Sequence, residues 1–153
     1  MGSEIGQFDE WDKNGEVQWF LTDYTSHARL QLYLAELGRI YLENPPLWEQ
    51  DCSPKGFSLD TAQGGIFAYR RYDLSGNEIV VALNFTPYRI CKYSLGVSLG
   101  GSWKELISSD SVRFGGSGVE NGTAEAFANK NAKTPYSLTV DLPPLGAVVL
   151  KHI

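Results

Sequence analysis

Cysteine is scarce in this sequence, and its two cysteines, Cys52 and Cys91, lack the close spacing of a metal site. Because nothing marks the chain as secreted, we expect both thiols to be free. There is no run of Lys and Arg, and the net charge of −5 comes from acids and bases mixed along the chain, so a nucleic acid is not an expected partner. No stretch reaches the ~20 apolar residues of a membrane span, and the acidic N-terminus has no apolar signal core. We therefore expect a cytoplasmic protein without a membrane partner.

The residue types that carry most catalysis are also sparse. The two histidines, His27 and His152, are far apart in the chain, and neither stands near a cysteine at metal-ligand spacing. We expect His27 to be a packing or surface residue at the start of a helix, and His152, which is penultimate, to fray. No serine stands in a nucleophile elbow. The Gly-rich residues 115–118 lack the Lys-Ser or Lys-Thr of a phosphate-binding loop, so we interpret them as a flexible loop and expect no catalytic residue, metal site or cofactor.

Aromatic residues, in contrast, are plentiful, with four Trp, eight Tyr and seven Phe. Sugar rings stack on aromatic faces, which points to carbohydrate, but the cores of β-sandwiches are also rich in aromatics, and this second explanation is favoured. An acidic cluster near the N-terminus is the best candidate for acid/base chemistry on sugars, which requires two carboxylates ~5 to 10 Å apart. Spacing within a loop favours solvated acids instead. The cluster consists of Glu4, Asp9, Glu10 and Asp12.

The first part of the chain predicts an irregular loop followed by one long helix. Residues 1–25 show no period, and helical spacing begins near Thr25 or Ser26, either of which can cap the helix. The helix is predicted over about residues 26–44, because Pro45 and Pro46 end it. A wide apolar stripe predicts that it packs on something substantial. The stripe consists of Leu30, Tyr33, Leu34, Leu37, Ile40 and Tyr41.

After residue 50 the apolar period changes to two, which is typical of strands. Residues 66–72 and 78–85 alternate on either side of a turn at 73–77, so they predict a hairpin. Residues 113–133 are rich in Gly, Asn and Ala and predict a long loop. Short strands joined by Gly and Pro turns indicate an antiparallel β-sandwich. The other predicted strands are residues 92–97, 102–108, 136–142 and 145–151.

The order of short motifs resembles the C-terminal part of the 1,4-α-glucan (glycogen) branching enzymes, members of the α-amylase superfamily. The resemblance covers essentially the whole chain, and its specificity comes from the series rather than from any one motif. The matching segments are MGSEIGQ at residues 1–7, EW at 10–11, WFLTDY at 19–24, RR at 70–71, NFTP at 84–87, WKE at 103–105, GGSG at 115–118, YSL at 136–138 and LPPL at 142–145. Departures include Val17-Gln18, Ser108-Ser109 and Leu59.

The resemblance implies a mainly β protein, with an α-amylase-type C-terminal all-β domain at residues 47–153. Residues 1–46, a loop and the helix, then belong to the last segment of a (β/α)8 barrel. Family enzymes cut an α-1,4-glucan and rejoin the piece through an α-1,6 bond, using carboxylates upstream of the matched segment. We therefore expect this chain alone to be inactive, with its own barrel and an α-glucan as partners. Next to a barrel rim, Glu4, Gln7 and Trp11 are expected to line the glucan cleft.

Two other readings stay open at this point. The chain can be a stand-alone glucan-binding module, which needs an exposed aromatic platform, or a structural domain that binds nothing. The candidate platform residues are Trp48, Tyr88, Tyr93 and Trp103. If the branching-enzyme reading holds, the isolated chain exposes apolar surface on its helix, and its first ~25 residues are mobile.

Overall fold

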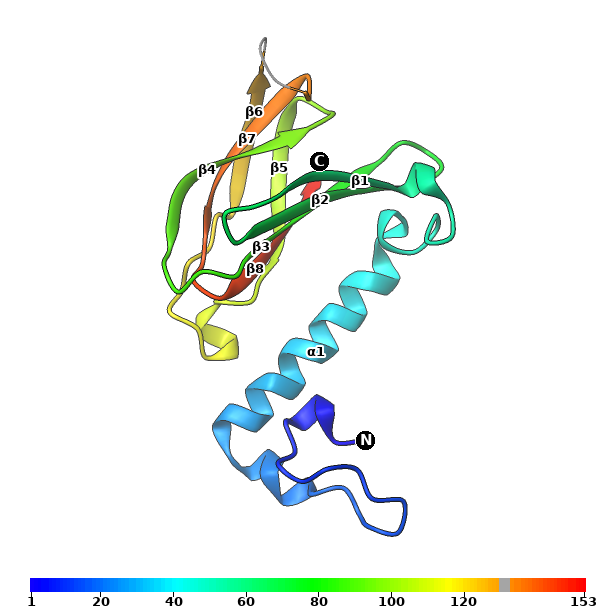
Figure 1. The fold of residues 1–153 in the computed structure, drawn as a ribbon, viewed down its shortest axis with the longest axis vertical. Helices are drawn as coiled ribbons and strands as arrows, with labels where there is room; N and C mark the ends of the chain where they lie inside the picture. The colour runs from blue at the N-terminus through cyan, green and yellow to red at the C-terminus, as the bar shows by residue number, and fades with distance from the viewer. Residues whose placement is uncertain (130–132) are drawn as a thin grey trace.

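The computed structural model describes residues 1–129 and 133–153 and divides visibly into a β-sheet unit and a narrower N-terminal region (Figure 1). Helix α1 (Thr25–Glu43) leads from the sheet to the N-terminal segment, which folds back against the far end of the helix. That segment holds two short 3-10 helices, η1 (Ser3–Ile5) and η2 (Trp19–Asp23). The chain therefore presents its first residues far from the sheet.

Helix α1 confirms the predicted helix to within one residue at each end. The predicted cap is wrong, because Tyr24 precedes the helix and no side chain caps it. Its end follows the prediction, since Pro45 begins the short 3-10 helix η3 (Pro45–Leu47). The side-chain carboxamide of Asn44 donates to the carbonyl of Ile40 at 2.7 Å and satisfies one of the last carbonyls of the helix.

Eight strands form one antiparallel sheet in the order β1-β2-β3-β8-β5-β6-β7-β4. The sheet coils so that β1-β2-β3-β8 face β5-β6-β7-β4 across a core, which confirms the predicted sandwich in the form of one continuous sheet (Figure 1). The strands are β1 (Phe57–Gln63), β2 (Ile66–Tyr72), β3 (Glu78–Asn84), β4 (Ile90–Val97), β5 (Gly101–Ser108), β6 (Thr123–Ala128), β7 (Tyr136–Leu142) and β8 (Gly146–His152).

Alternation along the strands builds the core. Ile66 and Ala68 of β2 and Val80 of β3 point inward, where they meet Leu138 of β7 and the fully buried Trp103 of β5. At about 25 cal/mol per Å² of apolar surface removed from water, such side chains supply most of the driving force for folding. The sheet unit therefore carries a core of its own.

Two strands depart from the prediction. The stretch predicted as a loop over residues 113–133 contains β6, whose Ala-rich sequence buries only Ala126 and so gives little alternation to read. Strand β1 was not among the predicted strands, and its register shifts between Leu59 and Thr61, which interrupts the period of two. His152, expected to fray, instead ends β8, with its Nε2 donating to the carbonyl of Gly100 at 2.9 Å.

A tight loop between β5 and β6 packs against the helix. The Asp110 carboxylate accepts hydrogen bonds from the amide of Ser117 at 2.9 Å, the Ser117 hydroxyl at 2.6 Å and the amide of Val119 at 2.9 Å. Gly116 has no room for a side chain, because a Cβ there would lie 2.1 Å from the Asp110 carbonyl oxygen. The Gly-rich run therefore serves close packing.

The same loop contacts α1 directly. It includes the 3-10 helix η5 (Val112–Phe114), and the Phe114 ring packs edge-on against Tyr33 with centroids 5.1 Å apart. Beside it, Arg113 pairs with Glu36 at 3.3 Å. These two contacts tie the helix to the sandwich.

Candidate functional site

Of the three residues predicted to bind substrate, two line one hollow in the N-terminal segment. Gln7 and Trp11 border a space of about 270 Å³. Trp11 exposes 62% of its surface, whereas Glu4 is exposed in η1 and is not among the lining residues. The structure thus brings Gln7 and Trp11 to one place without Glu4, and their role in substrate binding stays a prediction.

Gln7 also organises this hollow. Its Oε1 accepts the amide of Gln18 at 3.0 Å, and its Nε2 donates to the carbonyl of Asp9 at 3.1 Å. The close approach of the Gln7 side chain to the backbone at position 2 requires a glycine there. Gly2 has φ 83°, and a Cβ at this position would lie 2.5 Å from Oε1 of Gln7. Gln7 therefore holds the two sides of the loop together while it lines the hollow.

Two of the four carboxylates in the acidic cluster accept hydrogen bonds from the same loop. Asp12 accepts the amide of Asn14 at 2.9 Å, and Asp9 accepts the side-chain amide of Gln18. Both bonds fold the loop back on itself, as Asx turns do. This supports the interpretation of Asp9 and Asp12 as loop acids.

A second, apolar hollow of about 380 Å³ lies beside the first, and the sequence interpretation did not foresee it. It is lined by Phe8, Phe20 and Tyr24, each more than half exposed. His27 anchors it, because Nδ1 donates to the carbonyl of Ile5 at 2.6 Å and the ring packs edge-on against Phe8. His27 is therefore a packing residue, one of the two roles predicted for it.

The four aromatics proposed for a sugar platform do not form one. Trp103 is fully buried and its indole donates to the carbonyl of Leu99 at 3.2 Å, while Tyr93 packs against the core. Trp48 and Tyr88 are exposed, but Trp48 follows η3 and Tyr88 stands in the β3–β4 connection. This observation disfavours the stand-alone module as it was predicted.

The outer face of β1, β2 and β3 carries a continuous row of apolar side chains, here called the outer strip. Phe57 stacks on Tyr69 at 5.4 Å between centroids, and Tyr69 lies 5.7 Å from Phe67. Phe67 is paired with Leu83 in the ladder, and Leu83 with Ala147. The outer strip consists of Phe57, Phe67, Tyr69, Leu83, Phe85 and Leu145.

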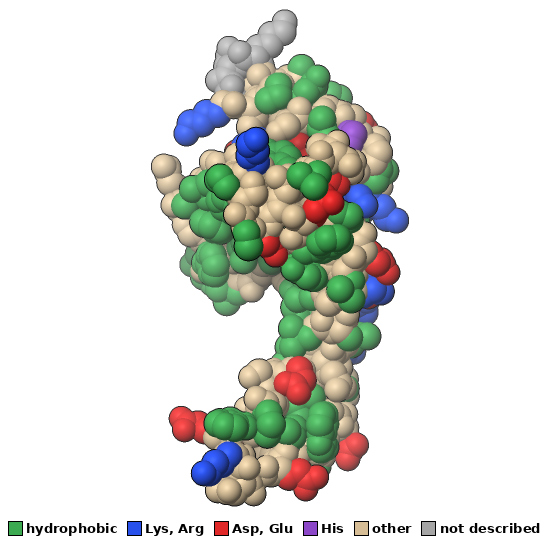
Figure 2. All heavy atoms as spheres, turned by 90° about the vertical axis from the view of Figure 1, so that its right-hand side faces the viewer, with side chains coloured by type: hydrophobic (Ala, Val, Ile, Leu, Met, Phe, Trp, Pro, Cys, Tyr) green, Lys and Arg blue, Asp and Glu red, His purple; other side chains and the backbone are tan. Residues whose placement is uncertain are grey.

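Helix α1 continues this apolar surface. Its Tyr33 lines a groove of about 260 Å³ together with Leu83, Phe85 and Leu145. Phe85 and Leu145 remain 65% and 72% exposed. Figure 2 shows hydrophobic side chains on both sides of the recess between the β unit and the N-terminal region. A surface of this kind is typical of a contact with another folded body.

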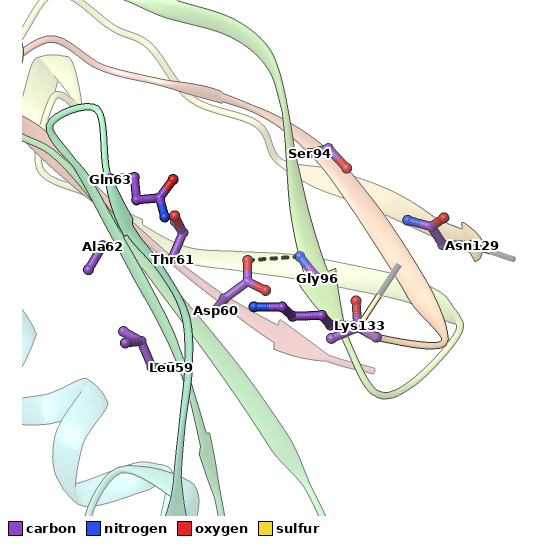
Figure 3. A pocket seen from close by; sticks show the side chains of 10 residues that line it. Leu59, Asp60, Thr61, Ala62, Gln63, Ser94, Gly96, Asn129 and Lys133 are labelled. Atoms are coloured by element: carbon purple, nitrogen blue, oxygen red, sulfur yellow. Dashed lines mark hydrogen bonds between the residues drawn. The ribbon is translucent and has the colours of Figure 1, made fainter. Parts of the chain in front are cut away.

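A polar cleft of about 530 Å³ separates β1 from β4, the two strands that end the sheet. Figure 3 shows Asp60, Thr61 and Gln63 extending from β1 toward β4, with Lys133 reaching back toward Asp60. The Asp60 carboxylate accepts the amide of Gly96 at 3.1 Å. This cleft is larger than the two N-terminal hollows and the groove beside Tyr33.

Among the described residues, no group of three or more His, Cys, Asp or Glu side chains is arranged to hold a metal ion. No helix in residues 1–129 or 133–153 is both long and apolar enough to cross a lipid bilayer. Cys52 and Cys91 are free and exposed.

Residues 58–153 match the family described as alpha amylase, C-terminal all-beta domain, and the match takes in all eight strands apart from Phe57. The chain belongs to this family. Curated relatives extend the likeness beyond the family domain to the N-terminal region. The chain is 39% identical to the 1,4-alpha-glucan branching enzyme of Pseudomonas putida, over 99% of its own length and 21% of that protein.

Two further branching enzymes repeat this result. The enzyme of Albidiferax ferrireducens is 40% identical over 100% of the chain, and that of Aquifex aeolicus is 38% identical over 99% of it, with 25% of each relative covered. The chain therefore spans about a fifth to a quarter of the length of the curated relatives it matches. The resemblance to the C-terminal part of branching enzymes is confirmed.

Solved structures share the fold at much lower identity. An α-amylase from H. orenii superposes with a TM-score of 0.50 at 17% identity, over 81% of this chain and 20% of that one. A pullulanase from Group B Streptococcus superposes with a TM-score of 0.52 at 16% identity, over 90% of this chain and 18% of that one. At these identities the likeness shows the fold alone.

Proposed function

We propose that the chain acts as the C-terminal part of a cytoplasmic branching enzyme, which transfers a cut α-1,4-glucan segment to an α-1,6 linkage in glycogen. Residues 47–153 form a domain that braces the catalytic barrel, and residues 1–46 complete the last barrel segment. The chain alone is inactive in this proposal. Support comes from relatives named as branching enzymes, of which the chain covers only 21% to 25%.

The observation that carries the bracing role is the outer strip and its continuation onto α1. Exposed apolar surface costs about 25 cal/mol per Å² in water, so a contiguous row of aromatic and aliphatic side chains is stable when another body covers it. The groove that joins Tyr33 to Phe85 and Leu145 gives helix and sheet a common docking surface. We assign the barrel of the parent enzyme as the body that covers it.

The N-terminal hollow has a separate role in this proposal. Trp11 presents an exposed indole that can stack on a sugar ring, and Gln7 fixes the loop behind it through its bonds to Gln18 and Asp9. Glu4 stands apart from this hollow and is proposed to contact the glucan from the barrel rim. These three residues bind substrate only while the barrel is attached.

A chimera tests the bracing role in an intact enzyme. The matching C-terminal portion of the Pseudomonas putida relative is replaced by this chain, and branching of amylose is followed by the loss of iodine colour. We expect the chimera to branch amylose and the isolated chain not to. A soluble, folded chimera without activity contradicts the proposal.

Matched substitutions in the chimera locate the contact. Phe85→Asp places a charge on the outer strip and is expected to lower the yield of soluble enzyme and its thermal midpoint. Leu74→Asp is the control, because Leu74 is also well exposed (76%, against 65% for Phe85) but stands in the β2–β3 turn. Equal behaviour of the two variants would remove the outer strip from the interface.

A further inference from the structure

The seam between β1 and β4 is closed by side chains at one end. The amide of Gly96 donates to Asp60 at 3.1 Å, and the amide of Ser98 lies 3.1 Å from both carboxylate oxygens of Glu78. Arg70 adds a bond of 3.1 Å to the hydroxyl of Ser98 and one of 2.9 Å to Ser58. These bonds hold β4 at a fixed distance from β1 without a backbone ladder, so the cleft beside them is preformed.

The other end of the seam stays open. Five consecutive residues of β1, from Leu59 to Gln63, line the cleft, so the edge of the strand borders it rather than one face. Thr61, Gln63 and Ser94 line the space, and within residues 1–129 and 133–153 their side chains make no hydrogen bond to the protein. Their donors and acceptors are therefore available to a ligand.

The charge of the cleft selects among ligands. Among the described residues that line it, Asp60 and Lys133 carry the ionisable side chains; they have opposite signs, and Asp60 is already bonded to Gly96. An anion such as a phosphate therefore gains little there. Hydroxyl and carboxamide groups both donate and accept, as sugar hydroxyls do, and about 530 Å³ falls within the common range of about 300 to 1,000 Å³ for small-ligand sites.

We propose that the cleft between β1 and β4 is a non-catalytic binding site for a short stretch of α-1,4-glucan. The inference rests on the proposed function and extends it, because the domain would then hold the polymer as well as brace the barrel. Thr61 and Gln63 contact sugar hydroxyls, and Ser94 contributes from the opposite strand. Since none of the described residues that line the cleft is aromatic, binding of one oligosaccharide is weak, with a dissociation constant on the order of 1 mM.

Weak binding is useful on a polymer. Many equivalent segments of one glycogen particle are present at high local concentration, so a site of low intrinsic affinity keeps a tethered chain near the enzyme. The cleft is therefore expected to matter more for glycogen than for short oligosaccharides.

Affinity electrophoresis of the 153-residue chain tests the site. Native gels are cast with and without glycogen, and retardation is compared between the wild type, Gln63→Ala and Thr61→Val. We expect both substitutions to weaken retardation at least about fivefold. Gln31→Ala is the matched control, because Gln31 is an exposed glutamine on α1, and it should leave retardation unchanged.

Hydrogen exchange in dilute solution locates the ligand independently. Maltoheptaose is expected to slow exchange in residues 60–63 and 94–96, whereas cellohexaose, a β-linked glucan, is not. No retardation by glycogen, or protection confined to Trp11 and Phe8, overturns the inference. So does retardation that Gln63→Ala leaves intact.

The chimera separates this inference from the proposed function. Gln63→Ala in the chimera should keep branching of short amylose and lose affinity for glycogen. An active chimera whose cleft shows no protection refutes the glucan site while the bracing role stands. An inactive chimera whose cleft is protected by maltoheptaose refutes the bracing role, while the glucan site stands.

Discussion

The sandwich and the N-terminal region handle apolar side chains in opposite ways. Of the 20 buried hydrophobic residues within the described ranges, only Ile5, Leu21 and Ile40 lie before residue 47. Of the 20 large hydrophobic residues that are exposed in the same ranges, ten lie there. The sandwich thus has a hydrophobic core of its own, whereas most of the large apolar side chains in the first 46 residues are exposed to solvent. We therefore expect the sandwich to contribute more of the chain's stability than the N-terminal region does.

Replacing one tryptophan in each region should give the largest difference in the loss of unfolding free energy. Trp103→Ala is expected to cost about 3 to 5 kcal/mol of unfolding free energy, because it leaves a cavity at the centre of the core. Trp19→Ala, at a side chain 52% exposed, should stay within about 0.5 kcal/mol. Urea unfolding followed by circular dichroism measures both. Similar losses in the two variants would show that the regions share one cooperative core.

Breaking the loop that joins the regions is the next largest change. Asp110→Ala removes the acceptor of three hydrogen bonds and is expected to cost about 2 kcal/mol. Burial alone would raise the pKa of Asp110, but hydrogen bonds from Ser117, Val119 and Gly118 hold it below its usual value.

The effect of Asp110→Ala should appear first in the helix. Without the carboxylate, the contact of Phe114 with Tyr33 loosens, so amide exchange in α1 should accelerate more than exchange in β7. Asp23→Ala serves as the control, since Asp23 is exposed in η2 and has no described partner. Unchanged helix exchange in Asp110→Ala would mean that the loop does not dock α1.

The stability of the sandwich should vary with pH because of Glu78. Burial raises the pKa of this fully buried carboxyl, and the hydrogen bond from the Ser98 amide and the nearby charge of Arg70 oppose the shift only in part. A raised pKa means that the folded state binds the proton more tightly than the unfolded state, so stability is greatest below the unfolded pKa. It then falls as pH rises through the folded pKa.

Glu78→Gln should remove that pH dependence. The amide oxygen can still accept from Ser98, while the buried charge is gone. Unfolding midpoints measured from pH 4 to pH 8 are expected to decline in the wild type and to stay nearly level in the variant. A steeper decline in the variant would show that Glu78 is stabilising as a charge.

The smallest effect is expected on the exposed side of the helix. Hydrogen bonds from Arg39 lower the pKa of Glu36 to about 2, yet the Arg39 side chain is half exposed and its ion pairs are screened by water. Arg39→Ala should leave the urea midpoint of the sandwich unchanged within error. A clear loss would show that the stability of the sandwich depends on this helix surface.

Strong alternation made most of the sandwich predictable. The hairpin of β2 and β3 and the bounds of β7 follow from apolar residues at every second position, with turns that carry Gly or Pro. Strand β6 was missed because Ala contributes little to a hydrophobic period, and β1 because its bulge breaks the period. The helix was predictable, because the two prolines fix its end.

The sites were less predictable than the strands. Gln7 and Trp11 came from the family resemblance, and the hydrogen bond that joins Gln7 to Gln18 spans 11 residues of irregular loop. The cleft could not be foreseen, since it lies between two strands that do not pair and whose facing residues are more than 30 positions apart. Local patterns report pairing and burial, but not the space left between strands that do not pair.

The carboxylates at the seam have one more consequence, which concerns association of the folded protein. A strand at the end of a sheet normally exposes a row of unpaired amides that can template the strand of another chain. Here Asp60 and Glu78 occupy the amides of Gly96 and Ser98. These two amides are therefore not available to a strand of a neighbouring molecule, which disfavours edge-to-edge association at this end of β4.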